Sequence, residues 1–186
     1  MCIIIDKNCF GSVFSTESAD YTNFEPIKTW LKKGCNSKIV YGGTKYCEEL
    51  RLATKYSKIF RLFKDKNRVV ELNKDLVDRK QEEIELLVSS LIKQNIICED
   101  NSRPRFDDPH IVSIAVVSKC KLVCTKDEGL QTFLKMNFLR KEGFFPRSDE
   151  IPLIYCNLSN KDLLRSQNVA EICKEPGKLG KVKEAN

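Results

Sequence analysis

Five short runs of apolar residues along the chain predict buried β-strands. The first run, Cys2 to Ile5, is ended by Asp6, and its unbroken apolar character is typical of a strand that is covered on both faces. The other predicted strands span residues 38–41, 68–72, 121–125 and 152–156. A sheet of such strands needs helices on each side of it.

Helix signals separate these strands. The sequence places helices at residues 25–33, from 44 to about 63, from about 74 to 94, and from 109 onward. Thr44 and Asn73 are suitable N-caps for two of them, and Asp107 or Asp108 can cap the helix that begins with Pro109. Strands that alternate with helices predict an α/β fold with three layers, α/β/α, around a central, mainly parallel sheet of about five strands.

The length of 186 residues fits one domain with a single core. We expect residues 1–173 to form this domain and residues 174–186, with four lysines and few apolar groups, to form a flexible basic tail. The apolar runs are too short to cross a bilayer, so we expect a cytoplasmic protein that does not bind membranes. Nine cysteines, an odd count without Cys-x-x-Cys pairs, favour reduced thiols over a disulfide framework.

Positive charge is concentrated in one part of the chain. The whole sequence has 32 Lys and Arg against 26 Asp and Glu, but residues 28–68 alone hold twelve basic and three acidic residues. This segment can attract a nucleic acid, although a solvated lysine-rich surface explains the same pattern. The residues expected to contact RNA phosphates lie on the predicted helix from 44 to 63 and are Lys45, Arg51, Lys55 and Lys58.

Carboxylates follow the predicted strands at the edge where their carboxyl ends meet. Asp6 directly follows the first strand, and Asp127 comes two residues after Thr125 at the end of the fourth. Glu48 and Glu49 lie early in the helix after the second strand, and Asp108 opens the helix that leads into the fourth. Ligands of open parallel sheets bind at this edge. A group of carboxylates with a single histidine in the whole chain indicates a site for Mg²⁺ or Mn²⁺ rather than zinc.

The segments IIIDKNCF, EEL, DDPHIVSIA and LVCTKD, in this order, resemble the PIN-domain nucleases, which are metal-dependent and mostly cleave RNA. The resemblance covers residues 1 to about 155. It implies that Asp6, Glu49, Asp108 and Asp127 bind Mg²⁺ or Mn²⁺ and act as the catalytic carboxylates of an endoribonuclease that cleaves single-stranded RNA. It also implies that two further residues, Asn8 and Thr125, orient the carboxylates or a water molecule.

Several alternatives to these assignments remain open at the level of sequence. Glu48, Asp107 and Glu128 compete with their acidic neighbours, while His110 is expected to be a surface residue of the first helical turn. A non-catalytic PIN-like module that binds RNA or a protein is the main alternative function. A haloacid-dehalogenase-like phosphatase is a weaker one, since that family has a second Asp where this chain has Asn8. The resemblance also leaves open a toxin with an antitoxin partner, and a homodimer.

Overall fold

Five parallel strands form the central sheet of the computed structural model, which describes residues 2–33, 37–97, 106–164 and 171–173. The strands are β1 (Cys2–Ile5), β2 (Lys38–Tyr41), β3 (Val69–Glu71), β4 (Leu122–Cys124) and β5 (Leu153–Tyr155). Their order in the sheet is β3-β2-β1-β4-β5, and every neighbouring pair is parallel. The predicted strands and the parallel sheet are therefore confirmed.

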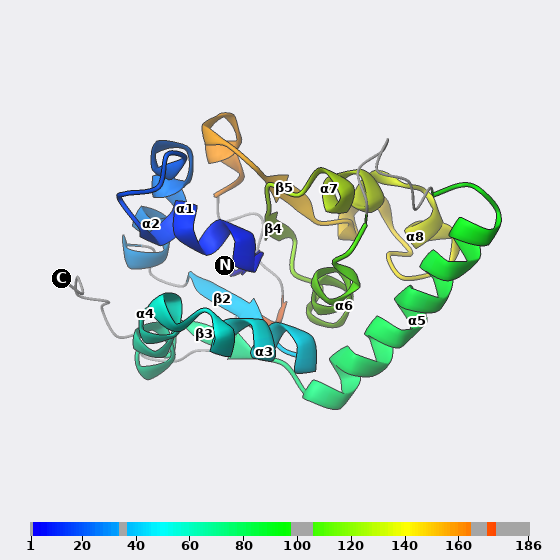
Figure 1. The fold of residues 1–186 in the computed structure, drawn as a ribbon, viewed down its shortest axis with the longest axis horizontal. Coiled ribbons are helices and arrows are strands. Elements are labelled where there is room, and N and C mark those ends of the chain that lie inside the picture. Colours follow the sequence, from blue (N-terminus) through cyan, green and yellow to red (C-terminus); the bar gives the residue numbers. More distant parts are fainter. Residues whose placement is uncertain (1, 34–36, 98–105, 165–170, 174–186) are drawn as a thin grey trace.

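Helices cover both faces of this sheet. The longer helices are α2 (Tyr21–Lys33), α3 (Thr44–Leu52), α4 (Thr54–Asp65), α5 (Lys74–Lys93), α6 (Pro109–Ser118) and α7 (Glu128–Lys135). Shorter helical segments are η1 (Lys7–Cys9), α1 (Phe10–Phe14), α8 (Phe138–Lys141), η2 (Ser148–Glu150), η3 (Leu158–Leu163) and η4 (Glu171–Cys173). Figure 1 shows α1, α2 and α4 on one side of the sheet and α6 and α7 on the other, which is the predicted three-layer architecture.

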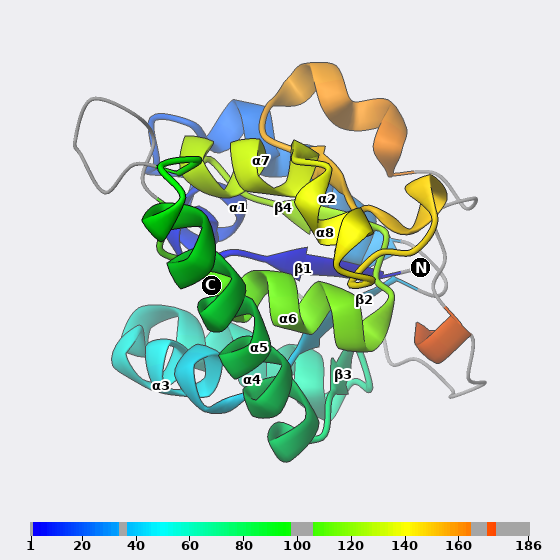
Figure 2. The ribbon, with the colours of Figure 1, turned by 90° about the vertical axis from the view of Figure 1, so that its right-hand side faces the viewer.

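The helix α5 lies outside these layers. It lies at the edge of the molecule in Figure 1 and crosses in front of α6 in Figure 2, and it packs against α6. Its buried residues are Val77, Ile84 and Leu91. Asn73 caps α5 as predicted, because its side-chain oxygen accepts a hydrogen bond from the Leu76 N–H at 3.1 Å.

Two predicted helices have different bounds in the structure. The helix expected from 44 to about 63 is broken at Ala53, whose ψ of 61° is not helical, so that α3 and α4 are separate helices. The separation lets α4 bury Phe60 and Phe63 in the core while α3 follows the sheet edge. The helix expected from residue 25 begins earlier, at Tyr21, and contains Pro26 within its second turn.

The start of α3 is fixed by contacts with α5. Gly43 has a φ of 79°, and a Cβ atom there would lie 2.6 Å from Val77 Cγ1, so the position needs glycine. The next residue, Thr44, donates hydrogen bonds from its backbone N–H and its hydroxyl to Asp78 on α5. Thr44 is thus the first helical residue rather than the predicted N-cap, and it ties α3 to α5.

One cysteine pair contradicts the expectation that the thiols are reduced. Cys2 at the start of β1 and Cys173 in η4 form a disulfide, with their Cα atoms 6.1 Å apart. The fold brings these residues together although 171 positions separate them, a pairing that short spacing motifs do not reveal. The remaining cysteines in the described ranges are free. The predicted tail, residues 174–186, lies outside the described residues.

Candidate active site

The sheet changes its direction of growth between β1 and β4, and the site lies at the carboxyl ends of these two strands. Chain segments leave this point toward β2 on one side and toward β5 on the other. Such a switch point opens a crevice beyond the strand ends, where open α/β sheets bind ligands. Asp6 directly follows β1, and Thr125 directly follows β4, so both residues stand at the crevice.

Asp6 is held in place by two hydrogen bonds. Its Oδ1 accepts from the backbone N–H of Asn8 at 3.0 Å, and its Oδ2 accepts from the Thr125 hydroxyl at 2.8 Å. Burial raises the pKa of Asp6, and these two hydrogen bonds oppose the rise. The Asn8 side chain is exposed, so the contact predicted for it is made by its backbone, whereas the buried Thr125 hydroxyl orients the carboxylate directly.

Asp127 meets the same threonine. The Thr125 hydroxyl oxygen accepts a hydrogen bond from the Asp127 N–H at 3.0 Å, which couples the fourth predicted acid to the first. The Asp127 carboxylate also accepts from the Leu130 N–H and so caps α7, which leaves its second oxygen for the crevice. The competing Glu128 is exposed on α7.

Glu49 and Asp108 lie on either side of His110. The His110 Nε2 is 3.4 Å from Glu49 Oε2, and its Nδ1 is 3.8 Å from Asp108 Oδ1. The His110 side chain is only 2% exposed, so the expectation of a surface histidine is wrong. Its Nδ1 is buried and has no hydrogen-bond partner among the described atoms. An imidazole between two carboxylates from α3 and the start of α6 therefore connects both helices at the crevice.

The geometry also distinguishes Glu49 and Asp108 from the acidic residues next to them in the sequence, Glu48 and Asp107. Glu48 is exposed and lies 3.8 Å from Arg51, on the surface of α3, whereas Glu49 is turned toward His110. Asp108 occupies the N-cap position of α6 but makes no capping hydrogen bond with its side chain. The Asp107 side chain is exposed. The inward carboxylates are thus the ones that the sequence motifs favoured.

Electrostatics couples three of the acids, Asp6, Asp108 and Asp127, whereas Glu49 is connected to them through His110. Burial and then the negative charge of Asp6 raise the pKa of Asp108 to about 6, and Asp127 adds to the rise. Burial also raises the pKa of Glu49, but the hydrogen bond and charge of His110, together with nearby lysines, outweigh it and hold that pKa below its ordinary value. We call Asp6, Glu49, Asp108 and Asp127 with His110 the acid cluster.

The acid cluster has the donor chemistry of a site for a hard divalent cation. Within the described ranges no three His, Cys, Asp or Glu side chains are already gathered closely enough to chelate a metal. Burial is the largest cause of the raised Asp108 pKa, but the charges of Asp6 and Asp127 add to it, and a cation would relieve this repulsion. Carboxylate oxygens are the ligands preferred by Mg²⁺ and Mn²⁺. The residues present therefore fit such a cation.

The four predicted RNA-binding cations do not lie on one helix. Lys45 on α3 donates a hydrogen bond to the Asp107 carbonyl at 3.1 Å and lies beside the acid cluster. Lys55 on α4 is 3.5 Å from Glu17. Arg51 and Lys58 line a groove between α3 and α4. The break at Ala53 thus divides the predicted basic helix face.

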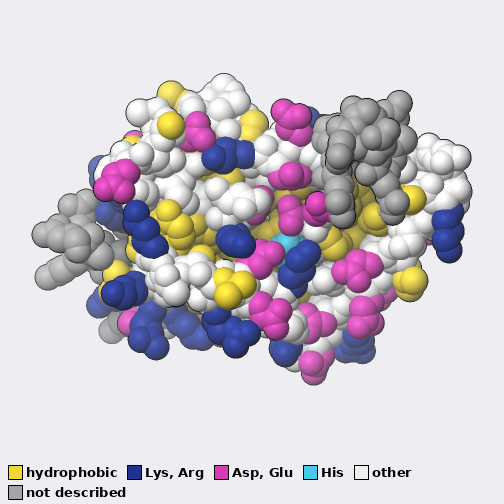
Figure 3. Space-filling model, viewed as in Figure 1, with side chains coloured by type: hydrophobic (Ala, Val, Ile, Leu, Met, Phe, Trp, Pro, Cys, Tyr) yellow, Lys and Arg dark blue, Asp and Glu magenta, His cyan; other side chains and the backbone are white. Residues whose placement is uncertain are grey.

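The distribution of charge on this face of the molecule is visible in Figure 3. Asp and Glu side chains surround the histidine in a recess near the centre, and Lys and Arg gather toward the end where α4 lies.

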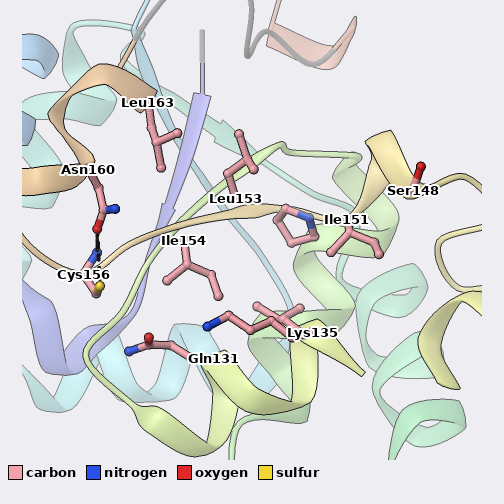
Figure 4. Close-up of a pocket in the computed structure, with 11 residues that line it drawn as sticks. Gln131, Lys135, Ser148, Ile151, Leu153, Ile154, Cys156, Asn160 and Leu163 are labelled. Atoms are coloured by element: carbon pink, nitrogen blue, oxygen red, sulfur yellow. Dashed lines mark hydrogen bonds between the residues drawn. The ribbon is translucent and has the colours of Figure 1, made fainter. Parts of the chain in front are cut away.

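A separate cavity of about 530 Å³ lies next to the edge strand β5 (Figure 4). Ile154 and Leu163 belong to its wall, where Asn160 Oδ1 accepts from the Cys156 N–H, and its described lining contains no carboxylate.

The chain matches no family profile, no curated protein and no solved structure. Among the described residues, no helix is both long and apolar enough to span a membrane. The functional interpretation therefore rests on the geometry of the acid cluster. The position of His110 between two carboxylates was missed at the level of sequence, although it follows Asp108 by two residues in the first turn of α6.

Proposed function

We propose that the protein is a Mg²⁺- or Mn²⁺-dependent endoribonuclease of the PIN type that cleaves single-stranded RNA. The observation that carries this proposal is the convergence of carboxylates on one crevice: Glu49 and Asp108 flank the buried His110, and the charges of Asp6 and Asp127 add to the effect of burial in raising the pKa of Asp108. Buried carboxylates that raise one another's pKa mark a candidate functional site, and a cation would relieve their repulsion.

Each acid would contribute to cation binding in its own way. Asp6 is held rigidly by Thr125 and the Asn8 N–H, so it would fix the position of the cation at the strand end. Glu49 and Asp108 would approach from the helices, with His110 setting the space between them. Asp127, whose negative charge raises the pKa of both Asp6 and Asp108, would contribute a further carboxylate oxygen.

The remaining residues would bind the substrate. A bound divalent cation would supply the activation of water and the stabilisation of the leaving oxygen of the scissile phosphodiester. Lys7 and Lys45 stand near Glu49, where their positive charges lower its pKa, and they would bind phosphates on either side of the cleaved bond. Phosphate contacts of this kind supply affinity but read no sequence.

The direct test is cleavage of an unstructured RNA by the purified protein. Cleavage should require added Mg²⁺ or Mn²⁺, stop with EDTA, and disappear in the Asp6→Asn variant. Glu48→Gln, on the same helix as Glu49 but facing solvent, is the matched control and should cleave like the parent. Full cleavage in EDTA would exclude the metal-dependent reaction. RNA binding without cleavage would favour the non-catalytic alternative, and release of phosphate from small phosphomonoesters would favour the phosphatase.

A further inference from the structure

A groove between α3 and α4 lies next to the acid cluster and presents mainly positive charge. It has a volume of about 850 Å³. Its cations are Arg51, Lys58, Arg61 and Lys64, and the one carboxylate of its described lining is Asp65. Leu50 and Tyr41 belong to its apolar floor. Figure 3 shows Lys and Arg side chains gathered over the region of α4 on this face.

Two of the four groove cations form no ion pair within the described part of the chain. Lys58 and Arg61 are exposed and form no ion pair there, and Arg51 is 77% exposed with Glu48 3.8 Å away. Lys64 differs, since it pairs with Glu71 at 2.8 Å and donates to the Tyr41 hydroxyl at 3.2 Å. Burial raises the pKa of Tyr41 to about 12, so its phenol stays neutral and adds no negative charge to the groove.

Aromatic contacts connect the floor of the groove to the acid cluster. The ring of Tyr41 lies 6.4 Å from the ring of Tyr46, and the ring of Tyr46 lies 6.3 Å from that of His110. The Tyr46 hydroxyl donates to the Ile5 carbonyl at 2.6 Å, which fixes this connection at the carboxyl end of β1. Helix α3 also carries Glu49 into the acid cluster and Leu50 into the groove. The two sites are therefore separated by a single layer of side chains.

We infer that the groove between α3 and α4 binds the segment of single-stranded RNA that flanks the cleaved phosphate, with Lys58 and Arg61 as its principal phosphate contacts. This inference rests on the proposed nuclease function, because the acid cluster would hold one phosphate of the same strand. Proteins that bind single strands combine a positive groove with apolar or aromatic surface for bases, and the groove has both. An acidic peptide is the competing ligand, but it would have no reason to continue toward the acid cluster.

The test compares RNA lengths in a cleavage-deficient background. The probes are fluorescent oligouridylates of about 4 and about 12 nucleotides, a range in which single-strand binding sites fall. Both are titrated against full-length Asp108→Asn protein, at a Mg²⁺ concentration high enough to offset its weakened cation site, with and without the added substitutions Lys58→Ala and Arg61→Ala. The matched control adds Lys135→Ala and Arg140→Ala, exposed cations of α7 and α8 that lie outside the groove.

The longer RNA should lose affinity when the groove cations are removed. At roughly 0.7 counterions released per phosphate contact, two lost contacts weaken binding about 25-fold at about 0.1 M salt and lower the salt slope by about 1.4. The shorter RNA, which reaches only the acid cluster, should bind with unchanged affinity. Photocrosslinking of 4-thiouridine in the longer RNA should label the peptide that contains Leu50 or Leu62.

Three results would overturn the inference. Equal affinity and salt slope of the groove variant and the control pair would show that RNA does not use the groove. Equal losses for both RNA lengths would place the contacts at the acid cluster instead. Groove-dependent binding of a Glu- and Leu-rich peptide with unchanged RNA binding would assign the groove to a protein partner. Failure of the nuclease proposal is recognised separately, by groove-dependent RNA binding in a parent protein that does not cleave.

Discussion

Replacing Asp108 with Asn should stabilise the metal-free protein. Asp108 is 18% exposed, and burial together with the charges of Asp6 and Asp127 raises its pKa to about 6 from an ordinary value of 3.8. The folded state is therefore penalised for holding this carboxylate ionised. Asn keeps the shape of the side chain and removes its charge, so the penalty disappears with the substitution.

The magnitude follows from the difference between the two pKa values. At about 1.4 kcal/mol for each pH unit, a rise from 3.8 to about 6 corresponds to about 3 kcal/mol at neutral pH. Because Asp108 titrates together with its neighbours, we expect a gain of about 1–3 kcal/mol in the free energy of unfolding. For a chain of this length that gain raises Tm by roughly 2–4 °C for each kcal/mol.

The pH dependence has a definite sign. A carboxyl group with a raised folded-state pKa is protonated in both states below about pH 4, where the parent and Asp108→Asn should be equally stable. As the pH rises through about 6, the parent should lose stability relative to the variant, and the difference should then stay constant. Urea unfolding in EDTA from pH 4 to pH 8 measures this. The control Asp65→Asn, an exposed acid on α4, should shift stability by less than about 0.5 kcal/mol.

Added Mg²⁺ should reverse the order of the two proteins. A cation at 1,000 times its Kd stabilises the folded parent by about 4.1 kcal/mol, which exceeds the expected advantage of the variant, and the variant should gain much less. If Asp108→Asn is less stable than the parent in EDTA at pH 8, then Asp108 is a structural residue and its carboxylate is not under repulsion. If both proteins gain equally from Mg²⁺, the acid cluster is not the cation site.

Three further predictions test other parts of the structure. Glu49→Gln should abolish cleavage, whereas Glu48→Gln should retain most of it; comparable losses would contradict the inward position of Glu49. His110→Ala should raise the Mg²⁺ concentration for half-maximal cleavage by roughly 10-fold, because loss of a residue that supports a metal ligand typically has this effect. An unchanged Mg²⁺ requirement would show that Glu49 needs no support from His110. Reduction of the Cys2–Cys173 disulfide should lower the free energy of unfolding, measured with urea, by up to about 5 kcal/mol according to the entropy of the closed loop. The stability of Cys173→Ser should not change when reductant is added.

The sheet was predictable because each strand is encoded within a few consecutive residues. The run from Cys2 to Ile5 has no polar position, and all four residues are buried in β1. The helix from Thr44 was predicted too long because its break depends on tertiary packing. Ala53 is a good helix former, and it leaves the helical conformation where α3, which contacts α6 and η1, gives way to α4, which contacts α1.

The position of the acids was predictable for a similar reason, since parallel strands place their carboxyl ends at one edge. The sequence did not reveal which donors would hold them. The Thr125 hydroxyl contacts Asp6 across a separation of 119 residues, and no local pattern encodes such a pair. His110 was misplaced because a histidine in the first turn of a helix is usually exposed, whereas here the neighbouring α3 covers it with Tyr46 and Glu49.

The basic residues show most clearly what sequence alone leaves undetermined. Charge density indicated the segment of residues 28–68, but the side of the helix that each cation occupies depends on the break at Ala53. After that break Lys55 points to Glu17, and Arg61, absent from the predicted set, joins Lys58 in the groove. Affinity for a phosphate chain depends on cations that lie along one path, not on how many the segment contains. The groove between α3 and α4 is therefore a property of the fold, and variants in it test the proposed RNA binding separately from the proposed chemistry of the acid cluster.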